Sequence, residues 1–209
     1  TFPLMNLAAA FGSLVGVGAA TLMSVRLGQR DYETANKVLG NVFVLNIILG
    51  LVFTVLILSF LDPILIFFGA SAGTLPYARE YMEVILLGNV VTHMYLGLNA
   101  LLRSSGNPQK AMYATIFSVI INLVLNPFFI FVLGLGIKGS AMATVISQTL
   151  MLIWQIRIFS NKKNFVHLKK GVFRLDRKIV LDSMAIGLSP FLMNAASSLI
   201  VLMINQGLS

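Results

Sequence analysis

Asparagine and proline interrupt one of the most apolar parts of the chain, the run 111–133. Asn122 and Asn126 lie one helical turn apart, and an unpaired polar side chain at membrane depth costs about 1 to 3 kcal/mol. Such residues usually mark a cavity or a pathway, so the pair predicts a binding site. Pro127 cannot donate its backbone N–H, and we expect the helix to bend or break there. The alternative is that the asparagines only bond the carbonyls freed by Pro127.

Two further side chains have the chemistry of a membrane site. His93 is the only ionisable residue near the middle of an apolar segment, which suggests a proton relay. The alternative is a neutral histidine that is hydrogen-bonded to a neighbouring helix. Tyr81 is an amphipathic residue of the kind that lies near a membrane interface or faces a cavity. Pro190 is expected to break a second apolar helix, as Pro127 does the first.

Enzymatic chemistry finds no support in the sequence. We find no Ser-His-Asp or Cys-His arrangement, no histidine or carboxylate cluster with metal spacing, and no phosphate-binding loop. The chain has no cysteine, which excludes disulfides and thiolate metal sites. We therefore predict neither an enzyme nor a bound cofactor.

The composition is that of an integral membrane protein. Hydrophobic residues make up 57% of the chain and charged residues 11%, and the mean hydropathy is +0.90. Segments that are nearly free of charge and about 20 residues or longer can cross the ~30 Å hydrocarbon layer as helices. Six segments qualify, which predicts an all-α polytopic helical bundle: 3–25, 39–61, 81–102, 111–133, 137–156 and 183–204.

The positive charges alternate between connections. Thirteen of the 15 Lys and Arg residues lie in or beside the first, third and fifth connections between these segments, and two in the others. The positive-inside rule then places residue 1 outside and 160–182 in the cytoplasm, as for a multi-pass protein of the cell (inner) membrane. The net charge of +8 is explained by topology and by attraction to lipid headgroups rather than by nucleic acid.

Local signals predict how the helices pack and begin. Small residues in the segment 3–25, such as Gly16 and Gly18, favour close approach of neighbouring helices. Asp31 follows Gly28 at a solvated turn, where Glu33 and Lys37 are spaced as a helical ion pair. Asp176 is expected to cap the last helix.

Three blocks resemble the multidrug and toxic compound extrusion (MATE) transporters. They are Gly-Asn-Pro at 106–108, Ile-Asn-Leu-Val-Leu-Asn-Pro at 121–127, and Gly-Ile-Lys-Gly-Ser-Ala-Met-Ala-Thr at 136–144. The residues around 16–36 extend the match. The resemblance implies twelve helices in two pseudo-symmetric six-helix lobes, of which helices two to seven are present. Residues 1–160 would be the first lobe without its first helix, 161–182 a basic cytoplasmic connector, and 183–209 the truncated first helix of the second lobe.

The resemblance also implies a function and a site. Its members are antiporters that export amphipathic organic cations in exchange for Na⁺ or H⁺ by alternating access, and we expect a monomer. In relatives, an ion site of the first lobe uses a carboxylate of the first helix and the residues that match Tyr81, Asn122, Asn126 and Thr144. The last three are therefore candidate Na⁺ ligands. This chain departs from the family in having Asn126 where Asp is frequent, and Ser197 or Ser198 where some branches have Glu.

Two alternatives stay open at the level of the sequence. A lipid or lipid-linked oligosaccharide flippase of the same superfamily would need basic residues in its cavity, and the six segments contain no buried Lys or Arg candidate. A membrane scaffold without transport would favour uninterrupted helices, whereas 111–133 and 183–204 both contain proline.

Overall fold

The protein is helical throughout the part of the chain that the structure describes. This computed structural model describes residues 2–162, 164–169 and 171–207, with side chains from Leu14 to Ser197 and at Ile200 apart from the same gaps. The described residues form eight α-helices and one π-helical turn, η1, and no strand. The elements are α1 (Phe2–Gly28), α2 (Tyr32–Ser59), α3 (Leu61–Phe67), α4 (Leu75–Leu87), α5 (Asn89–Ser104), α6 (Pro108–Pro127), η1 (Phe128–Val132), α7 (Gly136–Ser160) and α8 (Arg177–Gly207).

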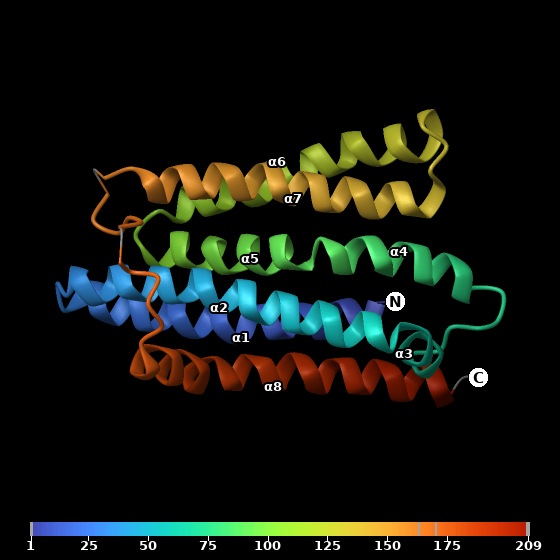
Figure 1. The fold of residues 1–209 in the computed structure, drawn as a ribbon, viewed down its shortest axis with the longest axis horizontal. Coiled ribbons are helices and arrows are strands. Elements are labelled where there is room, and N and C mark those ends of the chain that lie inside the picture. Colours follow the sequence, from blue (N-terminus) through green and yellow to red (C-terminus); the bar gives the residue numbers. More distant parts are fainter. Residues whose placement is uncertain (1, 163, 170, 208–209) are drawn as a thin grey trace.

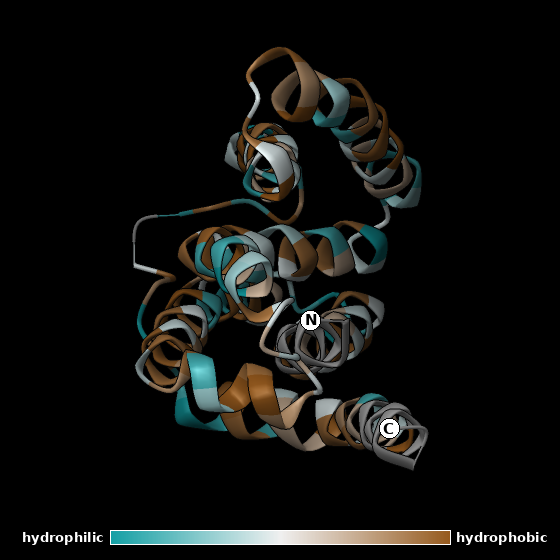
Figure 2. Cartoon of the chain, turned by 90° about the vertical axis from the view of Figure 1, so that its right-hand side faces the viewer, coloured by the Kyte–Doolittle hydropathy of each residue, from teal (hydrophilic) through white to brown (hydrophobic). Residues whose placement is uncertain are grey.

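The helices lie side by side along one long axis (Figure 1). The pair α6 and α7 is followed in space by α4 and α5, then by α1 and α2, and finally by α8; the same order appears when the bundle is seen from its end (Figure 2). The segment between α7 and α8, residues 161–176, is called the connector. It lies at the same end as the turns that follow α1 and α5, which we call the connector end. α1 begins and α8 ends toward the opposite end.

Most of the long helices can cross a membrane. Over the described residues, α2, Pro108–Val132, α7 and Arg177–Ser197 are each long and apolar enough, and α4 with α5 forms a fifth span if the bent pair counts as one. α1 is a helix of 27 residues, in which Leu14–Gly28 is apolar. The predicted all-α membrane bundle is therefore confirmed.

The segment 81–102, expected as a single span, is instead broken at Gly88. α4 and α5 meet there at an angle of 56°. A Cβ atom at Gly88 would collide with the Val145 side chain of α7, so only glycine allows this approach. Asn89 then begins α5 and donates a hydrogen bond to the Gly50 carbonyl of α2 at 3.2 Å. The break is held by contacts with two neighbouring helices.

Glycines bring α1 close to its neighbours, as the sequence predicted. Gly18 lies against the Ser183 carbonyl of α8, and Gly187 lies against the Leu14 carbonyl of α1. A Cβ on Gly16 would be 3.2 Å from the Gly97 Cα of α5. Larger side chains at these positions would force the helices apart.

The expected break at Pro190 is wrong. α8 continues through Pro190 as one helix from Arg177 to Gly207. Membrane helices tolerate a single proline when their neighbours and local adjustments satisfy the freed backbone groups. The close packing of α8 on α1 around Gly187 supports the helix on the turn before the proline.

Pro127 changes the type of helix. α6 ends at Pro127 and the chain continues directly into η1. The Leu133 N–H closes this wider turn on the Phe128 carbonyl at 3.1 Å. The predicted interruption is therefore a change from α- to π-helical hydrogen bonding within one span, Pro108–Val132.

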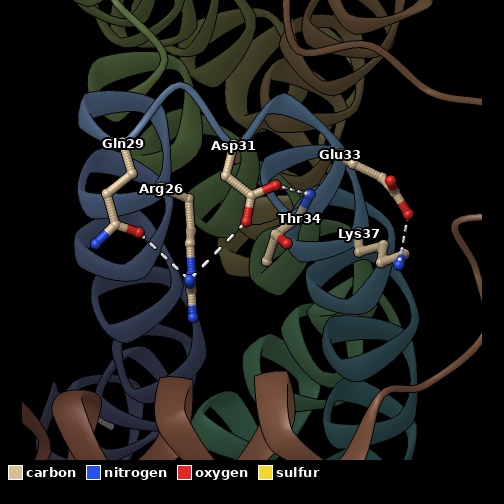
Figure 3. Close-up of polar contacts among 6 residues, drawn as sticks. All are labelled: Arg26, Gln29, Asp31, Glu33, Thr34 and Lys37. Atoms are coloured by element: carbon tan, nitrogen blue, oxygen red, sulfur yellow. Dashed lines mark hydrogen bonds and ion pairs between the residues drawn. The ribbon is translucent and has the colours of Figure 1, made fainter.

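The turn between α1 and α2 contains the predicted Glu33–Lys37 pair and further contacts of Asp31 (Figure 3). Asp31 accepts a hydrogen bond from the Thr34 N–H at 3.0 Å and lies 3.9 Å from Arg26, and Lys37 pairs with Glu33 at 2.8 Å. The hydrogen bonds from Thr34, its side chain first, lower the pKa of Asp31 below its ordinary value of 3.8. Asp31 therefore stays ionised to a lower pH than an unperturbed aspartate, and the stability that the cap contributes is lost only as the pH falls through the lowered folded pKa.

Two buried asparagines of α2 hold the connector. Asn36 accepts from the His167 N–H at 2.8 Å, and Asn41 accepts from the Asp176 N–H at 2.8 Å. Each amide nitrogen donates in return to the carbonyl two residues earlier in the connector, at 3.4 and 3.2 Å. Asp176 also accepts from the Lys178 N–H at 2.9 Å and so begins α8 as predicted.

Candidate ion and substrate site

Three of the predicted site residues form one chain of hydrogen bonds between α6 and α7. Asn126 donates to the Asn122 Oδ1 at 3.3 Å, which their spacing of four on α6 allows. Asn122 donates across to the Thr144 Oγ1 of α7 at 3.1 Å. Thr144 in turn donates to the Ser140 carbonyl of its own helix at 3.1 Å. The structure thus brings Asn122, Asn126 and Thr144 together.

A cavity of about 200 Å³ lies beside this chain. Its walls are Ser118, Val119 and Asn122 of α6 and Thr144, Ser147 and Gln148 of α7. Gln148 accepts a hydrogen bond of 2.6 Å from the Thr92 hydroxyl of α5, which joins a third helix to the cavity. Sequence reasoning missed Ser118 and Gln148, although both were visible as polar residues four positions from Asn122 and Thr144.

The side-chain oxygen of Asn126 is a hydrogen-bond acceptor that no donor among the described residues reaches. This atom, Oδ1, is buried. The oxygens of Asn122 and Thr144 already accept hydrogen bonds from the neighbouring amides. The described residues contain no group of three or more His, Cys, Asp or Glu side chains that could hold a metal ion. The chain therefore supplies neutral oxygens, of which that of Asn126 is free for a cation or a hydrogen-bond donor.

Tyr81 lies elsewhere. It packs against an apolar cluster of α2, α3 and α4 that includes Phe53, Leu61 and Met82. No described hydrogen bond joins its hydroxyl to the residues between α6 and α7.

His93 is buried between helices rather than exposed to the cavity. It is 1% exposed, and its ring packs edge-on against Phe53 of α2 at 6.3 Å. Neither ring nitrogen has a hydrogen-bond partner among the described residues, so the expected bond to a neighbouring helix is absent. Asn46 of α2 is also fully buried with an unpartnered amide, and it lies against Gly97, one turn after His93.

Comparisons with known proteins identify the fold. The MatE family model matches residues 1–128. Multidrug export protein MepA of Staphylococcus haemolyticus (strain JCSC1435) is 30% identical over 205 residues, which are 98% of this chain and 45% of the relative. The chain therefore spans about half the length of the curated relatives that it matches.

Solved structures agree over nearly the whole chain. An inward-facing multidrug resistance MATE family transporter of the MOP superfamily is similar with a TM-score of 0.91 and 29% identity, over 96% of this chain and 46% of that one. A second similar structure is that of a MOP superfamily transporter from Pyrococcus furiosus Vc1 (DSM3638), with a TM-score of 0.85 and 30% identity over 95% of this chain and 44% of that one. That transporter is described as having a binding pocket of reverse polarity that suggests a different function.

The fold and its long apolar helices define a polytopic α-helical membrane protein. The chain belongs to the MatE family, and the resemblance to the MATE transporters is confirmed.

Proposed function

We propose that the protein containing this chain is a secondary active antiporter that exports amphipathic organic cations in exchange for Na⁺ or H⁺. The hydrogen-bonded chain Asn126–Asn122–Thr144, which leaves one buried oxygen unpaired beside a cavity, carries the proposal. A relative that is named a multidrug export protein supports the substrate class. In this proposal residue 1 lies outside the cell and the connector end faces the cytoplasm.

Alternating access requires helices that shift as units around a site near the membrane centre. We propose residues 1–160 as part of one lobe, 161–182, which include the connector, as the cytoplasmic segment between the lobes, and 183–209 as the first helix of the next lobe. The bend at Gly88 and the π-helical turn η1 supply discontinuous helices of the kind found around transporter sites. The glycine contacts between α1 and α8 would then lie between the lobes.

The side chain of Asn126 limits which ion this lobe can couple to transport. An amide oxygen can bind Na⁺ or accept a hydrogen bond, but it cannot take up and release a proton as a carboxylate does. We propose that Asn126 is a neutral ligand or positioning group. Any proton coupling in this lobe would then rest on a carboxylate outside the sequence shown.

The test replaces Asn126 in the full-length protein, reconstituted in vesicles with a Na⁺ or H⁺ gradient. We expect Asn126→Ala and Asn126→Leu to lower ion-driven transport of an organic cation such as ethidium by about tenfold or more, since one lost charge-assisted contact is worth about 1.5 to 3 kcal/mol. Leu123→Ala is the matched control, because Leu123 lies on the same helix and is 71% exposed.

Transport has to be expressed per folded molecule, measured by size-exclusion chromatography of the purified variants. Parental transport in both Asn126 variants would exclude the ligand role. It would leave an asparagine whose amide only holds the Asn122 side chain in place.

A lipid-linked pyrophosphate flippase is the second candidate. It is considered because one similar transporter is described as having a binding pocket of reverse polarity and a different function. Such a substrate carries several negative charges and needs Lys or Arg to hold it. The cavity between α6 and α7 is lined by neutral residues only. We therefore expect no flipping of a fluorescent lipid pyrophosphate in the same vesicles.

A further inference from the structure

A groove at the connector end lies apart from the site between α6 and α7. It has a volume of about 280 Å³. Lys110 lies near the start of α6, and Trp154 and Arg157 lie near the end of α7. These three side chains line the groove together with Ile158, Asn161 and Asn164.

The described residues that line this groove include no carboxylate to balance its positive charge. None of the seven acidic residues of the chain lies between Glu83 and Asp176. Among the described residues, neither Lys110 nor Arg157 takes part in an ion pair. The turn between α1 and α2 at the same end is different, because its Arg26 and Lys37 pair with carboxylates (Figure 3).

An exposed apolar surface continues from the groove along both helices. On α6, Tyr113 and Phe117 follow Lys110 by three and seven residues, so they share its face. On α7, Leu150 and Ile153 precede Arg157 by seven and four residues. All four of these apolar side chains are 45% to 50% exposed. The charged groove is therefore the end of an apolar track that runs toward the membrane centre.

Trp154 indicates how deep the groove lies relative to the membrane surface. It is the only tryptophan of the chain, and it lies one turn before the groove's Ile158. Tryptophan is enriched where the hydrocarbon layer meets the headgroups, because its ring is apolar and its indole N–H needs a polar partner. The presence of Trp154 in its lining therefore favours a groove at the level of phospholipid phosphates.

We propose that this groove binds an anionic phospholipid such as phosphatidylglycerol. Lys110 and Arg157 contact the phosphodiester, and the acyl chains lie along the apolar track of α6 and α7. Two unpaired cations favour an anionic headgroup over a zwitterionic one, because a choline or ethanolamine cation would be repelled. The site is independent of the transported substrate.

The experiment uses the full-length protein in nanodiscs that contain phospholipid with brominated acyl chains, a quencher of tryptophan fluorescence at contact. The difference between the parent and Trp154→Phe isolates the signal of Trp154. We expect brominated phosphatidylglycerol to quench that signal more strongly than brominated phosphatidylcholine at equal mole fraction. In the Lys110→Gln, Arg157→Gln double variant the preference should fall by about tenfold or more.

The matched control is Arg30→Gln, Lys178→Gln, which removes two cations at the same end but outside the groove. It should keep the preference, as should the charge-retaining variant Lys110→Arg, Arg157→Lys. Equal quenching by the two lipids in the parent would overturn the proposal, and so would an unchanged preference in the neutral double variant. Displacement of the brominated lipid by soluble glycerol phosphate would show a site for free phosphate esters and would also overturn it.

Discussion

Thr144 is the residue that joins the two helices of the candidate site. Its hydroxyl accepts from Asn122 on α6 and donates to the Ser140 carbonyl on α7. A side chain without a hydroxyl would leave the Asn122 amide with an unsatisfied donor, which costs about 1 to 3 kcal/mol when buried. The geometry of Asn126 depends on the same link, since Asn126 bonds to Asn122.

We predict that Thr144→Val lowers both the thermal stability and the transport of the full-length protein. Thr144→Ser keeps the hydroxyl and should retain most of both. Thr149→Val serves as the control, because the Thr149 hydroxyl bonds only to the Val145 carbonyl of its own helix. Differential scanning fluorimetry and vesicle transport measure the two effects. A loss in Thr149→Val as large as that in Thr144→Val would contradict a special role of the link.

The sequence was informative about this site where residues repeat at helical spacing. Asn122 and Asn126 share a face of α6 because they are four residues apart, and the MATE resemblance pointed to Thr144 as their partner. Tyr81 was not predictable in the same way, because its position depends on the bend at Gly88. That bend separates α4 from the direction of α5 and leaves Tyr81 among the apolar residues of α2 and α3.

At the scale of the elements, contacts between helices decide where a helix is interrupted. The span is interrupted at Gly88 because Val145 of α7 and Gly50 of α2 come close to the chain there. Pro190, which sequence reasoning expected to break α8, lies within one continuous helix. The lengths and positions of the apolar segments were predicted from hydropathy, and the interruption at Pro127 from the residue type. The bend at Gly88 was not predicted, since it depends on neighbours that are distant in sequence.

The connector offers a prediction at this scale. Asn36→Leu with Asn41→Leu removes both asparagines that bond to it and leaves the amides of His167 and Asp176 without partners. The free energy needed to open the connector locally should then fall by about 1 to 3 kcal/mol for each lost pair of hydrogen bonds. Hydrogen exchange of residues 165–176 would rise while that of α6 and α7 stays constant.

Gln29→Leu is the control for the connector, because it changes a polar residue at the same end whose side chain bonds to Arg26 and not to the connector among the residues drawn in Figure 3. Unchanged exchange in the double asparagine variant would show that other contacts, such as the stacking of Tyr32 on Phe165, hold the connector.

At the scale of the whole molecule, charge is distributed between the two ends. Of the 13 Lys and Arg residues that the structure describes, 11 lie at the connector end. The opposite end contains Arg79, which pairs with Asp62 at 3.1 Å and Glu83 at 2.9 Å, and Lys138 on α7. The difference supports the proposed orientation with the connector end in the cytoplasm.

Single cysteines test this orientation, since the chain has none of its own. Phe165 is 75% exposed in the connector, and Thr74 is exposed at the opposite end. In intact cells, a membrane-impermeant maleimide should label Thr74→Cys and not Phe165→Cys, and permeabilised cells should label both. The reverse pattern in intact cells would place the connector outside.

The π-helical turn η1 has a consequence for the length of the chain. Each of its hydrogen bonds spans one residue more than in an α-helix, so Phe128–Val132 contains a residue that regular coiling would not need. Removing one residue from this turn would let the span continue as an α-helix from Pro108 into the turn that ends at Gly136. Homologous chains that differ by a one-residue gap at this point can therefore share the rest of the bundle, and a gap there in an alignment would reflect a change of coiling rather than of fold.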